Sequence, residues 1–202
     1  QARAPQLVIG AGSGLGVAWR VWQDDRYVVL PSESGYTSFA PPDAEFDALL
    51  PRLREQLGSH RIGTEQVVSG RGLVTLYRVL SSEARPTTRF DGELDGRDGE
   101  EVMRRATQDH EPLALRAVDL FLRAYGSVTG DLALSMLARG GVYLAGGVAA
   151  RNAGLLSDGR FMRALQDKGP YAALASRLPV RLIVRPDLPL LGAAGLGWRS
   201  LA

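Results

Sequence analysis

The sequence predicts an α/β fold with a mixed β-sheet and flanking helices, and the order of its apolar segments carries that prediction. Short runs of branched and aromatic residues come first, at 7–10, 15–22 and 26–30, as is typical of strands that follow one another in a sheet. Stretches with helical spacing follow, and two further strands, both predicted to be buried, interrupt them at 142–145 and 180–184. Strands followed by helices with interleaved strands favour an α/β architecture.

The helices are predicted from periodicity and from capping residues. Asp43 is a good N-cap for a helix over 44–57, in which Phe46, Leu49 and Leu53 recur at helical spacing. Thr64 is expected to cap a short helix over 64–68. The remaining predicted helices cover 73–80, 100–108, 112–138, 161–167, 171–178 and 191–201.

Two polar segments are predicted as loops. Residues 31–42 follow the third strand and contain prolines. Residues 83–100, which read EARPTTRFDGELDGRDGE, are charged, glycine-bearing and without periodicity, so we expect a disordered or variable loop there.

Composition limits the possible functions. The chain has 202 residues, a mass of 21.7 kDa and 45% hydrophobic residues, which suits one domain or slightly more. Its net charge of +2 is scattered along the chain, which gives no indication of nucleic acid or an anionic membrane as a partner. The chain has no cysteine and only two histidines, and we expect no metal site held by the protein itself. No apolar run reaches 18 residues, and we expect a cytoplasmic protein.

The segment GAGSGLG, residues 10–16, is a candidate phosphate-binding loop. It does not fit G-x-G-x-x-G in either frame, because Leu15 or Val17 falls where the last glycine should be, and no lysine follows as a P-loop requires. The residues after it look like strand, which argues against a nicotinamide dehydrogenase. We therefore predict a hairpin turn with exposed N–H groups, which can hold phosphate oxygens or can be a simple β-turn.

A second glycine-rich segment, GGVYLAGG at 140–147, ends a predicted buried strand on a glycine pair. Such a pair lets a flat or phosphorylated ligand approach the backbone, and a tight strand–helix turn explains it equally well. Two glycine turns at strand ends fit a nucleotide cleft better than either turn does alone.

Two carboxylates, Glu33 in LPSESGY and Glu65 in TEQVVSGRGL, are candidate ligands of sugar hydroxyls. A carboxylate accepts hydroxyl protons in short, strong hydrogen bonds. Surface solvation explains Glu33 equally well, and a favourable position near the positive end of a helix explains Glu65. The residues alone do not single these two out from the other acidic side chains.

Taken together, these stretches resemble the bacterial glucokinases of the hexokinase, actin and Hsp70 superfamily. The matching segments occur in the family's order and cover most of the chain outside the 83–100 loop. They are GAGSGLGVA (10–18), LPSESGYTSFAP (30–41), EQVVSGRGLVTLYR (65–78), GDLALSMLARGGVYLAGGVAAR (130–151), FMRALQDKG (161–169) and VRLIVRPDLPLLGAAG (180–195).

The resemblance implies a fold and a set of site residues. The fold would be an actin-like, ribonuclease H-like ATPase lobe, with residues 1–190 as the large lobe and 191–202 as a returning C-terminal helix. Glu33, Tyr36 and Glu65 would bind glucose or a related hexose, and the cofactors would be ATP and Mg²⁺. The nucleotide contacts would come from Gly12, Ser13 and Gly14 at the phosphates and from Gly146 and Gly147 at the nucleoside.

The chain departs from the family pattern in two places. Tyr36 stands where the family usually has a histidine that touches the sugar. The family's Asp-x-Gly-Gly-Thr turn is not found in the 202 residues, and no residue here matches the family's general-base aspartate. We therefore expect that the N-terminal small lobe is absent and that this chain alone is not an active kinase. The resemblance also implies a homodimer, and an apolar C-terminal helix would favour self-association.

The leading functional hypothesis is thus ATP-dependent phosphorylation of glucose to glucose 6-phosphate by the complete protein, in which this chain supplies sugar and nucleotide contacts. The alternative is a catalytically inactive paralogue that binds a sugar or a nucleotide. Sugar binding without turnover would distinguish the two hypotheses.

Overall fold

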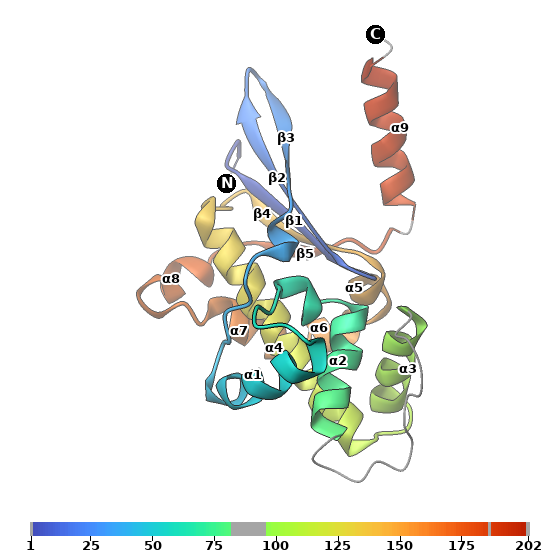
Figure 1. Cartoon of the computed structure of the whole chain (residues 1–202). Helices are drawn as coiled ribbons and strands as arrows, with labels where there is room; N and C mark the ends of the chain where they lie inside the picture. Colours follow the sequence, from blue (N-terminus) through green and yellow to red (C-terminus); the bar gives the residue numbers. More distant parts are fainter. Residues whose placement is uncertain (1, 82–95, 186, 201–202) are drawn as a thin grey trace.

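The computed structural model describes residues 2–81, 96–185 and 187–200, and within them the strands form one mixed sheet (Figure 1). The strands are β1 (Gln6–Ala11), β2 (Leu15–Gln23), β3 (Arg26–Ser32), β4 (Gly141–Ala145) and β5 (Val180–Leu182), in the order β3-β2-β1-β4-β5. β1, β2 and β3 pair as antiparallel neighbours, and β1 pairs with β4 and β4 with β5 in parallel. The predicted α/β class with a mixed sheet is confirmed.

Most helices lie below the sheet in Figure 1, whereas α9 stands apart from them at the upper right. The larger ones are α1 (Ala44–Leu57), α2 (Gly70–Ser81), α3 (Gly96–Thr107), α4 (Pro112–Ser135), α7 (Arg160–Gln166) and α9 (Leu188–Ser200). Short elements connect them: η1 (Ser34–Tyr36), η2 (Thr64–Gln66), α5 (Gly147–Arg151), α6 (Ala153–Leu156), η3 (Gly169–Tyr171) and α8 (Ala172–Ala175).

The core lies between one face of the sheet and the central helix α4. Alternate residues of β1, including Leu7 and Ile9, point into it and are fully buried, as the twofold period of a strand requires. On the helical side, Phe121 and Tyr125 of α4 pack against Phe161 of α7. Burial raises the pKa of the Tyr125 hydroxyl, which donates to the carbonyl of Ile9.

Local sequence signals explain several element boundaries. The Asp43 side chain accepts a hydrogen bond from the Phe46 amide, as expected of an N-cap, and Gly58 ends α1 in the left-handed conformation. Contrary to prediction, Thr64 does not cap η2, because Gly63 is the N-cap residue. The Thr64 hydroxyl donates instead to the Thr37 carbonyl.

Three other predictions need correction. Residues 96–100 belong to α3, because Val102 and Met103 are buried and packing of that face overrides weak local propensity. The rest of the predicted loop, 83–95, lies outside the described residues. β5 is a half-buried edge strand rather than a buried one, because β4 is its only partner among the described strands. The predicted helix over 171–178 is split into η3 and α8.

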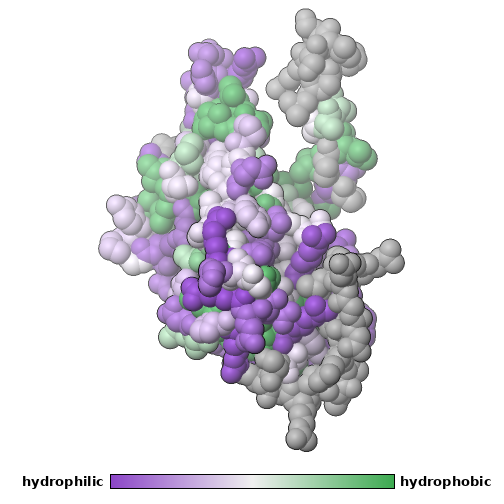
Figure 2. Space-filling model, viewed as in Figure 1, coloured by the Kyte–Doolittle hydropathy of each residue, from purple (hydrophilic) through white to green (hydrophobic). Residues whose placement is uncertain are grey.

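The surface is hydrophilic over much of the helical layer, and hydrophobic residues gather on the β2–β3 hairpin and at the start of α9 (Figure 2). Val29 on β3 and Leu190 and Leu191 on α9 are exposed. Self-association through α9 stays a prediction, since the side chains of Leu196 and Trp198 lie outside the described part. Among the described residues, none of the helices combines the length and the apolarity that a membrane crossing would need.

Candidate functional site

The candidate site is centred on the β1–β2 turn, at the carboxyl end of β1. Gly12, Ser13 and Gly14 form this three-residue turn, which is closed by a 2.8 Å hydrogen bond from the Gly12 amide to the Gly14 carbonyl. Among the described residues, the amides of Ser13 and Gly14 have no hydrogen-bond partner. The predicted hairpin turn with free N–H groups is confirmed, and two free amide dipoles are what an anion-binding turn offers.

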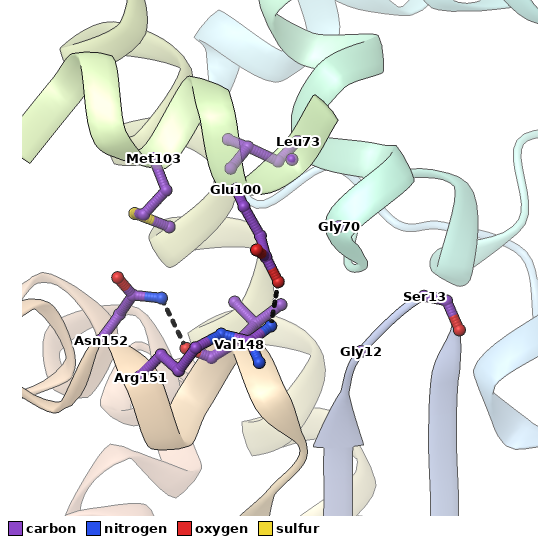
Figure 3. Close-up of a pocket in the computed structure, with 10 residues that line it drawn as sticks. Gly12, Ser13, Gly70, Leu73, Glu100, Met103, Val148, Arg151 and Asn152 are labelled. Carbon is purple, nitrogen blue, oxygen red and sulfur yellow. Dashed lines mark hydrogen bonds and ion pairs between the residues drawn. The ribbon is translucent and has the colours of Figure 1, made fainter. Parts of the chain in front are cut away.

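A cavity of about 260 Å³ opens on one side of this turn (Figure 3). Helices α2, α3 and α5 line the other sides, and the turn contributes Gly12 and Ser13. The apolar part of the lining comes from Leu73, Met103 and Val148. An apolar cavity with a few polar groups and free amides at its edge has the chemistry of a nucleoside phosphate site.

The glycine pair at the end of β4 forms part of the cavity's frame. β1 and β4 run in parallel, with Gly10 beside Ala145, so both strands end at the same edge of the sheet. Gly146 has φ +87°, and an added Cβ would lie 2.4 Å from the Ala11 carbonyl oxygen, so only glycine fits. α5 starts at the next residue and brings Val148, Arg151 and Asn152 to the cavity. A nucleoside contact by Gly146 and Gly147 stays a prediction.

Glu65 lies against Gly14 and Leu15 at the β2 end of the same turn, outside the cavity lining. Its Oε2 accepts a 2.9 Å hydrogen bond from the Leu15 amide, and a Cβ on Gly14 would lie 2.5 Å from that oxygen. Glycine at position 14 therefore lets the carboxylate approach the backbone. The structure thus brings a predicted sugar ligand into direct contact with the predicted phosphate loop, which spacing along the chain could not reveal.

Glu33 and Tyr36 flank a glycine that packs on the turn. A Cβ on Gly35 would lie 2.0 Å from the Leu15 carbonyl oxygen, so η1 sits directly against the start of β2. Both flanking side chains are exposed, Tyr36 by 52%, and the Glu33 carboxylate has no partner among the described residues. The Arg61 guanidinium lies over the Tyr36 ring, with its central carbon 5.4 Å from the centre of that ring.

Hydrogen bonds join the loops that carry these three side chains. The hydroxyls of Thr37 and Thr64 lie 3.3 Å apart, and Ser38 forms a β-bridge with Gly63. η1 and η2 therefore form one unit beside the turn. The turn therefore lines the cavity with Gly12 and Ser13 and contacts the Glu65 carboxylate at Gly14 and Leu15.

The segment after Glu65 reaches back to the cavity. The Gly70 amide donates a 2.7 Å hydrogen bond to the Gly12 carbonyl, and the Ser69 hydroxyl accepts from the Gly72 amide at the start of α2. Glu65 therefore binds one end of the β1–β2 turn at Leu15, and Gly70 binds the other end at Gly12. These two hydrogen bonds restrain the direction of the two free amides.

Sequence reasoning missed most of the cavity's lining. The missed residues are Gly70, Leu73, Gly99, Glu100, Met103, Val148, Arg151 and Asn152. The spacing of Glu100 and Met103 places them one turn apart on α3, but no local signal shows that this face turns toward the β1–β2 turn.

The described residues contain no cluster of three or more His, Cys, Asp or Glu side chains that could hold a metal ion.

The mixed sheet with flanking helices has the actin-like fold that is found in sugar kinases. The sequence model of the family described as glucokinase matches residues 1–198. The chain belongs to the glucokinase family.

Known relatives and structures agree with this assignment. The glucokinase of Trichormus variabilis is 34% identical over 208 residues, which cover 96% of this chain and 61% of the relative. A crystal structure of a glucokinase from an Antarctic psychrotroph superposes with a TM-score of 0.83 at 28% identity, over 97% of this chain and 58% of that one. The glucokinase of Balamuthia mandrillaris in complex with glucose superposes with a TM-score of 0.80 at 26% identity, over 92% of this chain and 51% of that one.

The chain therefore spans about 61% of the length of the curated relative it matches.

Proposed function

We propose that the complete protein transfers the γ-phosphoryl group of ATP to the 6-hydroxyl of glucose, and that this chain supplies contacts to both substrates. The observation that carries the proposal is the β1–β2 turn, whose free amides lie beside a nucleoside-sized cavity and next to Glu65. Glu33 and Tyr36 flank Gly35, which packs on Leu15 at the end of this turn. Phosphoryl transfer depends on holding donor and acceptor side by side with the developing charge stabilised, and a shared turn suits that task.

Each group has a defined part in this proposal. The adenosine lies in the cavity against Leu73, Met103 and Val148, and its phosphates reach the amides of Ser13 and Gly14. Glu65 and Glu33 accept hydrogen bonds from sugar hydroxyls, and these bonds orient the sugar. The Leu15 amide occupies Oε2 of Glu65, and Oε1 has no hydrogen-bond partner among the described residues, so it is available to a sugar hydroxyl.

We place no general base among the residues of this chain, and propose that an N-terminal small lobe of the complete protein provides it. Residues 1–190 are then assigned to the large lobe and 191–202 to the segment that returns to the small lobe, although α9 begins at Leu188, three residues earlier than predicted. Magnesium enters on the nucleotide phosphates. We also propose a cytoplasmic homodimer as the working form, on the strength of the family resemblance.

The nucleotide part is tested by equilibrium binding of ADP and AMPPNP to the chain. An added Cβ at Gly12 meets nothing within 4 Å, and Gly12 lines the cavity, so Gly12→Val should fold and obstruct the site. We expect wild-type binding and its loss in Gly12→Val. Gly154→Val is the matched control, because that position is also open and lies outside the cavity lining. Equal loss in both variants would refute the site.

The sugar part is tested by glucose calorimetry on Glu33→Gln and Tyr36→His. We expect weaker binding in Glu33→Gln and unchanged or tighter binding in Tyr36→His, which restores the residue usual in the family. No glucose binding by the wild type in the presence of AMPPNP would remove the sugar assignment.

One observation favours the second candidate, a paralogue that binds without turnover: the bulkier Tyr36 occupies the histidine position. Glucose binding without phosphorylation by the full-length protein would establish it.

A further inference from the structure

An ion pair spans the cavity from α3 to α5. Nη2 of Arg151 lies 2.6 Å from Oε1 of Glu100, and both residues line the cavity (Figure 3). Both side chains are more than half exposed, at 61% and 62%. An ion pair exposed to this degree contributes little to stability, so its position at the cavity calls for another explanation.

Among the described residues, the pair contains all the formal charge of the cavity lining. Of the ten described residues that line the cavity, Arg151 is the one cation and Glu100 the one anion. The neighbouring polar side chain, Asn152, already donates its amide hydrogen to the Val148 carbonyl at 2.8 Å. An anionic ligand in this cavity would therefore find one attractive and one repulsive charged side chain, and these two are bound to each other.

The guanidinium lies at the edge of the sheet where phosphates are expected. An added Cβ on Gly147 would lie 2.9 Å from Nη2 of Arg151, so the side chain folds back over the start of α5. α5 follows the end of β4, and β4 ends beside β1, whose turn presents the free amides of Ser13 and Gly14. Figure 3 shows Arg151 and the turn facing the same cavity from different elements.

We propose that Arg151 binds a phosphate group of the nucleotide and that Glu100 competes for it, so that the phosphate replaces Glu100 as the partner of Arg151 when the nucleotide binds. The proposal rests on the nucleotide site proposed above. Exchange is favourable because a guanidinium binds phosphate through two parallel charge-assisted hydrogen bonds, which are stronger than an exposed ion pair. Glu100 thereby lowers the affinity for nucleotide below the level that the cavity alone would give.

The test compares ADP with adenosine, which lacks phosphate, by calorimetry on the wild type and two variants. Glu100→Gln frees Arg151, and we expect ADP to bind about two- to fivefold more tightly. Arg151→Gln removes the phosphate contact, and we expect ADP to bind about tenfold more weakly or worse. Adenosine affinity should stay unchanged in both variants, and Arg151→Lys should restore part of the ADP affinity.

Asp187→Asn is the matched control. It breaks an exposed ion pair with Arg185, makes the same change in net charge as Glu100→Gln, and lies outside the cavity lining. We expect no change in ADP affinity. Equal tightening in this control would attribute the effect of Glu100→Gln to net charge and overturn the proposal.

Two further outcomes separate this inference from the proposed function. If the wild type binds ADP but Glu100→Gln does not tighten it, or if Arg151→Gln weakens ADP and adenosine equally, the exchange is refuted and the nucleotide site stands. If the wild type binds neither ADP nor AMPPNP, the nucleotide site fails and the exchange fails with it.

Discussion

Replacing Glu65 by alanine should destabilise the fold, whereas the same change at Glu33 should not. The Leu15 amide donates a 2.9 Å hydrogen bond to Oε2 of Glu65, and Leu15 is only 6% exposed. Glu65→Ala leaves that buried N–H without a partner, which costs about 1–3 kcal/mol of the free energy of unfolding. The exposed Glu33 carboxylate has no partner to lose among the described residues, so Glu33→Ala should change that free energy by less than about 0.5 kcal/mol.

Urea denaturation followed by tryptophan fluorescence measures both variants, since Trp19 and Trp22 lie on β2, the strand that begins at Leu15. The melting temperature of Glu65→Ala should fall by about 2–4 °C for each kcal/mol lost. Glu65→Gln should lie between the wild type and Glu65→Ala, because an amide oxygen can still accept the hydrogen bond without the charge. Equal stability of the two alanine variants would refute the reasoning that Glu65 holds the turn.

Three further predictions concern side-chain packing and pairing on the helices α4, α3 and α2. Gly126→Ala should lower the free energy of unfolding by about 1–3 kcal/mol, because the added Cβ would lie 2.2 Å from the Phe161 carbonyl oxygen. Gly154→Ala is the control, because an added Cβ there meets nothing within 4 Å. Equal loss of stability of the two variants in a urea titration would contradict the predicted clash. The pKa of Glu101 is lowered to about 2, chiefly by hydrogen bonds from Arg104, so its stabilisation is present above about pH 4.5 and is lost as the pH falls toward 2. The urea midpoint of Glu101→Gln should therefore fall less than that of the wild type between pH 5 and pH 2, and parallel curves would exclude this role. Tyr77→Phe should lower the free energy of unfolding by about 1–2 kcal/mol, because the Tyr77 hydroxyl donates a 2.7 Å hydrogen bond to the carboxylate of Glu111, the N-cap residue of α4. An unchanged urea midpoint would show that this hydrogen bond contributes nothing to stability.

Much of the secondary structure could be predicted from local sequence because short-range physics determines it. Asp43 caps α1 as predicted, and the β1–β2 hairpin turn follows from glycines placed between two strand-like runs. Prediction failed where packing overrides propensity. α3 begins at Gly96 inside a polar, glycine-bearing stretch, because its apolar face has α2 and α4 to pack against.

The candidate site was only half visible in the sequence. The glycine turn, Glu33, Tyr36 and Glu65 could be named from motifs and from the family resemblance. The sequence could not show that Arg151 and α3 line the cavity, because both are far from the turn along the chain and no local pattern indicates that they contact it.

The sequence by itself determined the class of fold, the positions of the glycine turns and the family, since composition, periodicity and motif order are local properties that folding preserves. Only the tertiary structure decided which surfaces meet. It placed Glu65 on the Leu15 amide, 50 residues away, and paired Arg151 with Glu100 across the cavity. The physical reason is that helices and strands form from neighbouring residues, whereas a site forms where burial of apolar faces brings distant segments together.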